Sequence, residues 1–345
     1  MSLNEYRMLA QDFAWTNRAE IGATFVTLLS SIWGRRFWLG SQIYLAFVCH
    51  AIPMIFFPET CLSYVKLNSG NTDAVHIQLV QWIGILIFTQ TLSFWLLSRS
   101  SDSATETPQL WAYTVHMGCM GIAKAFLYTY SSERSGATLH YRPLSLIPIS
   151  LSFLINLFYA LRSQDWAVNF EQVSQRNKYI HLDAILLLAF GVIWFAFPSL
   201  FLNCQIAAGS ADDLHNFLCH IIGAFLFYHA IMSICSVSFN KDDEKDAVIF
   251  LHFIGYVMLF AVFAVRHIKN WEDVSLKNAA LISAADILLI FNSFMAMNVD
   301  IDKYLTETLI PRVKQVPQDL HKILKAKTGF NTIFQHKIGH TWQLV

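Results

Sequence analysis

Eight apolar segments of nearly membrane-spanning length recur along this 345-residue chain and constrain its fold more than any other feature. A helix needs about 20 apolar residues to cross the hydrocarbon core of a bilayer. Helices suit that environment because open strands would leave backbone N–H and C=O groups unpaired in lipid. The segments cover residues 37–57, 75–97, 109–130, 143–161, 180–202, 215–237, 247–268 and 275–297. The sequence therefore predicts an all-α, polytopic, integral membrane protein with eight transmembrane helices.

The composition agrees with this class. Hydrophobic residues make up 55% of the chain and charged residues 14%, whereas a soluble domain carries about 25% charged residues. The formal net charge is zero, which gives no indication of nucleic-acid binding. The first 20 residues lack a continuous apolar stretch of the signal-peptide type. We therefore expect the first membrane helix to serve as its own insertion signal.

One stretch of the chain occurs twice, at residues 73–88 and 212–227, with a constant offset of 139. Six of the sixteen aligned positions are identical, and a Phe-Pro pair precedes each copy. The matched residues singled out are Asp73 with Asp212, His76 with His215, Gly84 with Gly223 and, upstream, Pro58 with Pro198. Shared order and spacing favour internal duplication. This predicts two tandem four-helix bundles, residues 37–161 and 180–297, in parallel orientation about an axis along the membrane normal.

Lysine and arginine predict the topology. The side that carries both termini holds 17 of them in its loops and tails, against 6 on the other side. The positive-inside rule then places both termini, and the linker 162–179, in the cytosol. Residues 1–36 are interpreted as an amphipathic segment in the membrane interface, with a mobile cytosolic tail as the alternative. The polar tail 298–345 could lie on anionic lipid, dock a partner or stay solvated.

The repeated stretch predicts a structural device rather than a catalytic one. An acidic residue before a helix accepts unpaired N–H groups, which assigns Asp73 and Asp212 to caps. Proline has no N–H and cannot continue a helix normally, so the Phe-Pro pairs predict fixed exits from the membrane. Internal glycines let helices approach closely. Each stretch thus combines a capping aspartate, a histidine near the membrane interface and a glycine at a helix contact. Together these features predict a site of helix packing.

Lys124 and Asp286 are charged residues inside the apolar segments and are better candidates for function. Lys124 and Asp286 would be costly in lipid, so both are expected to face the bundle interior. A contact between them across the two bundles is one interpretation. Alternatively, Lys124 extends its ammonium group to the outer interface, while Asp286 stays an interior polar site.

Histidines are the other titratable candidates within the apolar segments. They are His50 and His220 at one depth, and His116, His229 and His252 at another. Two levels of histidine are what the ligation of two haems requires. No haem-attachment motif is present, and polar neighbours explain single histidines more simply. We therefore predict no cofactor and no metal, and keep haem as the alternative.

The second copy has acquired titratable groups where the first has amides. Gln81 aligns with His220, and Gln90 aligns with His229. Cys61 and Cys204 lie in equivalent loops, where two free thiols are favoured over a disulfide. If function resides in this motif, the second copy is the place to expect it.

No phosphate-binding loop, nucleophile elbow or metalloprotease motif is present. The four-helix unit resembles the DoxX-like group of membrane proteins in the Phe-Pro pair at the end of its first helix, in Asp212 and in Gly223. The resemblance supplies no catalytic residue. The leading hypothesis is a non-enzymatic accessory or scaffold protein that packs against other membrane proteins or lipid. The alternatives are a transporter or channel with a polar pathway near the repeat interface, and a haem-type membrane oxidoreductase.

Overall fold

The structure is a computed structural model, and it describes residues 18–65, 73–98, 105–134, 146–163, 175–205, 211–269 and 276–297. Every regular element in these ranges is a helix, which confirms the predicted all-α class for them. The elements are α2 (Arg18–Ile32), α3 (Arg35–Ala46), η1 (Phe47–Ala51), α4 (Ile52–Phe56), α5 (Pro58–Val65), α6 (Ala74–Leu97), α7 (Glu106–Arg134), α8 (Leu146–Arg162), α9 (Gln175–Ala196), α10 (Pro198–Gln205), α11 (Asp213–Ser236), α12 (Asp242–Lys269) and α13 (Leu276–Ala296). The predicted tail 298–345, residues 1–17 and residues 164–174 of the predicted linker lie outside the described residues.

Five of the described helices are long and apolar enough to cross a membrane, so the membrane class is supported. They cover Arg35–Phe56, Ala74–Leu97, Arg176–Ala196, Asp213–Ser236 and Asp242–Ile268. Three shorter apolar helices accompany them: Ile21–Ile32, Leu146–Arg162 and Ser283–Ala296. The described residues therefore support several spans but not the full predicted set of eight.

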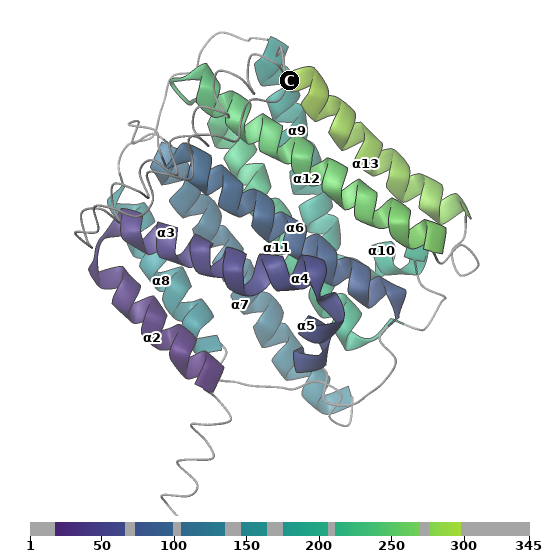
Figure 1. Ribbon diagram of the computed structural model, residues 1–345, viewed down its shortest axis with the longest axis horizontal. Helices are drawn as coiled ribbons and strands as arrows, with labels where there is room; N and C mark the ends of the chain where they lie inside the picture. The colour runs from purple at the N-terminus through teal and green to yellow at the C-terminus, as the bar shows by residue number, and fades with distance from the viewer. Residues whose placement is uncertain are drawn as a thin grey trace, which may run out of the picture. The chain divides into compact units, whose positions relative to one another are not determined.

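Helices α6 and α11 form the centre of the array. Both are buried over most of their length, which is why they read as nearly continuous apolar runs in the sequence. Helix α11 packs against α9, α7 and α6, and α6 packs in turn against α12 and α4. In Figure 1, α2 and α8 lie on one side of this pair, and α12 and α13 lie on the other. The central pair therefore positions every group discussed below.

The first helix that the structure describes, α2, packs against α8 and α3. Its buried residues include Thr27 and Ser30, whereas Phe25 and Ile32 are exposed. Apolar residues are exposed on this helix and polar residues are buried, which is the reverse of the pattern on a helix of a water-soluble protein. Contact with lipid is the environment in which that pattern is favourable.

Polar contacts fix the start of α3 against its neighbours. Arg35 and Arg36 both donate to the Glu106 carboxylate at the start of α7. One turn further on, Trp38 Nε1 donates to Asn156 Oδ1 on α8 at 2.8 Å, and both side chains are fully buried. A buried indole N–H requires such a partner, because an unpaired one costs free energy.

The first span contains a widened turn. Pro53 has no N–H to give to the carbonyl four residues earlier, and the Ile52 N–H bonds to the Phe47 carbonyl five residues back. The π-helical turn η1 results, and His50 lies within it with an exposed side chain.

Candidate functional site

Asp73 and Asp212, which begin the two matching stretches, cap α6 and α11 as predicted. Asp73 Oδ1 accepts hydrogen bonds from the backbone N–H groups of Val75 and His76, each at 2.9 Å. Asp212 Oδ1 accepts the His215 N–H at 2.9 Å. Each carboxylate thus satisfies N–H groups that the first turn of its helix leaves unpaired.

The structure brings these two caps together, which the sequence did not predict. His76 Nε2 lies 3.1 Å from Asp212 Oδ1, and His215 Nε2 lies 3.1 Å from Asp73 Oδ2. The two imidazole rings stack with their centroids 3.5 Å apart. We call these four residues the cap cluster. Sequence periodicity predicts which face of a helix is buried but not which helix lies against it. The pairing of each histidine with the aspartate of the other helix was therefore not predictable.

The cap cluster combines buried imidazoles with accessible carboxylates. His76 is 2% exposed and His215 1%, whereas the side chains of Asp73 and Asp212 are 43% and 45% exposed. Burial raises the pKa of both carboxyls, but hydrogen bonds from His215 and His76 outweigh it. The pKa of Asp73 and of Asp212 is therefore held well below its usual range.

One turn deeper, Gln81 and His220 make equivalent contacts. Gln81 Nε2 donates to the Ile55 carbonyl at 3.1 Å, and His220 Nδ1 donates to the Phe195 carbonyl at 2.6 Å. These acceptors lie near the C-terminal ends of α4 and α9, where helix carbonyls lack intrahelical partners. His220 therefore satisfies a helix end, as Gln81 does.

Gly84 and Gly223 lie where the central helices touch α4 and α9 most closely. A Cβ added at Gly84 would be 2.9 Å from Met54 Cβ, and one added at Gly223 would be 2.7 Å from both Phe195 Cβ and its backbone N. No side chain fits these distances. Both glycines are thus positions of close helix approach.

A second polar network lies in the interior of the second half, and its central residue was missed by the sequence reasoning. Asp183 Oδ1 accepts the Tyr256 hydroxyl at 2.9 Å, and its Oδ2 accepts the Ser233 hydroxyl at 2.6 Å and His252 Nδ1 at 2.9 Å. All four side chains are buried. A carboxylate within the apolar segment 180–202 was the signal that could have found it.

The network continues to His229. His252 Nε2 lies 3.1 Å from His229 Nδ1, so Asp183, His252 and His229 form a hydrogen-bonded series. His229 Nε2 and the nearby His116 Nδ1 have no hydrogen-bond partner within the described ranges. We call Asp183, Ser233, Tyr256, His252 and His229 the buried relay. It can hold a proton or pass one along its length.

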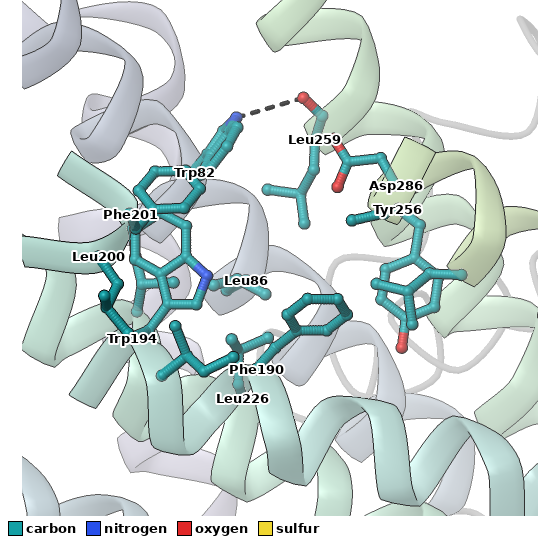
Figure 2. Close-up of a pocket in the computed structure, with 14 residues that line it drawn as sticks. Trp82, Leu86, Phe190, Trp194, Leu200, Phe201, Leu226, Tyr256, Leu259 and Asp286 are labelled. Atoms are coloured by element: carbon teal, nitrogen blue, oxygen red, sulfur yellow. Dashed lines mark hydrogen bonds between the residues drawn. The ribbon is translucent and has the colours of Figure 1, made fainter. Parts of the chain in front are cut away.

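Beside the relay is a cavity of about 250 Å³, and its walls are almost entirely apolar. Figure 2 shows Trp82, Phe190 and Trp194 around it, with the Asp286 carboxylate directed inward from α13. Asp286 Oδ2 is buried and has no hydrogen-bond partner among the residues that the structure describes. The Tyr256 ring forms part of the wall, and its hydroxyl reaches the buried relay.

The remaining predicted residues lie elsewhere. Lys124 is half-buried on α7, which packs against α11 and α8, whereas Asp286 is on α13, which packs against α12 and α9. These helices pack mainly against different neighbours, and the suggested Lys124–Asp286 contact stays a prediction. His50 is exposed and His220 bonds a carbonyl, so the predicted outer histidine level is not assembled as a facing pair. Cys61 is a free thiol, as the sequence favoured.

Comparisons with known proteins give a family but no described activity. No curated protein and no solved structure matches this chain. A family described as "Domain of unknown function (DUF8292)" matches residues 41–298. That region runs from α3 into the end of α13 and includes the cap cluster, the buried relay and the cavity. The chain therefore belongs to the DUF8292 family.

Proposed function

We propose that this protein binds, and carries across or within the membrane, a small apolar molecule bearing one basic group. The observation that carries the proposal is Asp286 Oδ2, which is buried at an otherwise apolar cavity and has no hydrogen-bond partner in the described part of the chain. A transporter was the alternative drawn from the sequence. That alternative had a polar pathway near the repeat interface, and the present proposal centres it on the Asp286 cavity.

The chemistry of the cavity selects the ligand. Mainly apolar and aromatic walls with few polar groups are typical of sites for small organic molecules. A buried carboxylate is costly unless it is paired, so a ligand amine that donates to Asp286 would relieve that cost. The faces of Trp82 and Trp194 would attract the same cation.

The buried relay supplies a route by which binding is coupled to a proton. Tyr256 belongs to both sites, because its ring lines the cavity and its hydroxyl donates to Asp183. A ligand that displaces the ring would alter the hydrogen bond to Asp183. Intramembrane carboxylate and histidine series are characteristic of proton-coupled membrane proteins.

The proposal includes an architecture of eight spans in two parallel four-helix units, with both termini cytosolic. Its support is the matched element order: a first helix, a short helix after Phe-Pro (α5, α10) and three further helices occur in each half. The contacts of Gln81 and Gly84 in the first half also correspond to those of His220 and Gly223 in the second.

Energy transfer from the cavity tryptophans tests the binding function. The full chain, purified in detergent, would be titrated with a dansyl-labelled alkyl amine and with the carboxylate of equal chain length. We expect saturable binding that favours the amine. Asp286→Asn should weaken amine binding about 10- to 100-fold, because it removes a charged hydrogen-bond acceptor.

Asp243→Asn is the matched control, since it makes the same chemical change at an exposed carboxylate on α12. Its amine affinity should equal that of the unmodified protein. Equal binding of amine and carboxylate, or an unchanged affinity in Asp286→Asn, would refute the proposed site.

The accessory or scaffold role remains a second candidate. Exposed apolar side chains on α2 and directly after it, including Phe25, Ile32 and Trp33, suit contact with another membrane protein as well as with lipid. A stoichiometric membrane partner that co-purifies in mild detergent, and is lost on Phe25→Ser with Ile32→Ser, would favour this role. An optical spectrum of the same sample tests the haem alternative, which requires a Soret band.

A further inference from the structure

The cap cluster poses a problem of proton placement that the caps alone do not solve. Both ring nitrogens of His76 and of His215 face carboxylate oxygens, at 2.9–3.1 Å. A neutral imidazole carries one N–H, so each ring can donate to one carboxylate only. The other nitrogen of each ring then directs a lone pair toward an oxygen.

One assignment of tautomers directs both ring N–H groups at Asp212 Oδ1, which also accepts the His215 backbone N–H. Asp212 Oδ1 lies 3.1 Å from His76 Nε2 and 2.9 Å from His215 Nδ1, so it can accept an N–H from each ring. The Asp212 backbone N–H, 3.3 Å from the same Nδ1 of His215, is the longer competing contact. In the neutral rings, the lone pairs of His76 Nδ1 and His215 Nε2 are left facing Asp73. Protonated rings would donate to Asp73 through the same nitrogens, so a metal ion and these protons compete for one position.

His76 Nδ1 is a second sign that the cap cluster lacks a group. It lies 3.1 Å from Asp73 Oδ1, yet this buried nitrogen has no hydrogen-bond partner in the part of the chain that the structure describes. Asp73 Oδ1 accepts the cap N–H groups and also lies 3.2 Å from His215 Nε2, while Oδ2 lies 3.1 Å from the same nitrogen. One ring nitrogen of each histidine and the Asp73 carboxylate thus lie beside one another.

We propose that Asp73, His76 Nδ1 and His215 Nε2 bind a divalent first-row transition metal ion, with Zn²⁺ as the reference ion. One ligand atom from each residue lies within 4.8 Å of the others. Tetrahedral zinc with bonds of about 2.0–2.1 Å separates its ligand atoms by about 3.3 Å. Asp73 Oδ1 lies 3.1 Å from His76 Nδ1 and 3.2 Å from His215 Nε2, which is close to that separation.

Asp212 is then the positioning residue of the site. Metal-bound histidines commonly donate their second ring N–H to a carboxylate, which fixes the tautomer and the ring orientation. Here a single carboxylate serves both rings. The ion would also balance the two carboxylate charges beside the positive ends of α6 and α11.

Two imidazoles and one carboxylate leave a coordination position for water or for an external ligand. The exposure of Asp73 and Asp212 opens this position to the aqueous side of the helices. The site is separate from the Asp286 cavity, so either proposal can fail without the other.

The experiment is a Zn²⁺ titration of the full chain in detergent against a chromophoric chelator, with metal analysis after desalting. We expect one chelator-reversible ion per chain. His76→Gln and His215→Gln should each abolish retention, and Asp212→Asn should weaken binding about 10- to 100-fold. His220→Gln, on the same helix as His215, is the matched control and should retain the ion.

The Co²⁺-loaded unmodified protein gives a second readout if the histidine variants do not fold. We expect visible d–d absorption of a low-coordinate nitrogen and oxygen site, without thiolate charge transfer in the near ultraviolet. Failure to retain Zn²⁺ at micromolar free concentration would overturn the proposal. So would retention that both histidine variants share, or a thiolate charge-transfer band.

Discussion

Replacement of Gly223 by alanine should destabilise the protein through one identifiable contact. The new Cβ would lie 2.7 Å from Phe195 Cβ and from its backbone N, and 2.9 Å from the Gly191 carbonyl oxygen. Ordinary contact begins at 3.4 Å. Because two of the three neighbours are backbone atoms, no side-chain rotation relieves the overlap, and α9 must move away by roughly 0.7 Å.

The magnitude follows from two opposing effects. Overpacking of this kind costs about 1–3 kcal/mol, and alanine recovers up to about 1 kcal/mol over glycine in a helix. Displacement of α9 also disturbs the His220–Phe195 hydrogen bond and the position of Asp183. We expect a net loss of about 1–2 kcal/mol in the free energy of unfolding.

Gly121→Ala is the control, since the nearest atom to its added Cβ is Ile149 Cγ2 at 3.7 Å. It should be neutral or stabilising by up to about 1 kcal/mol. Thermal unfolding of both variants in one detergent, followed by size-exclusion chromatography after heating, measures the difference. Equal midpoints for the two variants, or a higher midpoint for Gly223→Ala, would refute the close contact of α11 with α9.

Further predictions concern the buried polar groups. Asp183→Asn should lower the free energy of unfolding by about 1–3 kcal/mol, because an amide cannot accept all three donors that the carboxylate accepts. Asp286→Leu should raise the thermal midpoint, because it removes a buried carboxyl oxygen that has no partner among the described residues. Trp38→Phe should cost about 1–3 kcal/mol by leaving buried Asn156 Oδ1 unpaired, and Asn156→Leu in the same background should restore part of the loss. The folded-state pKa of Asp73 and Asp212 lies below the unfolded value of about 3.9. Their contribution is therefore complete above about pH 5 and is lost as the pH falls toward the folded pKa. An acid-unfolding curve of Asp73→Asn with Asp212→Asn should then be flatter below about pH 4 than that of the unmodified protein.

Local features of this fold were predictable from the sequence, and contacts between distant segments were not. Apolar length predicted the helices, since a span imposes a minimum length. Asp73 and Asp212 were recognisable as caps because capping depends on residues three positions apart. Gly84 and Gly223 were recognisable as packing positions for the same local reason.

The missed groups depend on which helices are neighbours. The pairing of His76 with Asp212 requires the starts of α6 and α11 to lie side by side, and no periodicity within either helix encodes that. Asp183 lies only a few residues inside its apolar segment, where a carboxylate can be mistaken for part of the helix entrance. Lys124 was paired with Asp286 from depth alone, but depth does not specify the neighbouring helix.

The exchange of partners in the cap cluster has a consequence for biogenesis. Before the second half is translated, His76 lacks both the Asp212 carboxylate and the His215 ring against which it packs. The two positive helix ends come together only as α11 arrives with its own acid. A chain that ends before α11 therefore differs chemically from the complete chain at this position, because the contacts between the two caps cannot form.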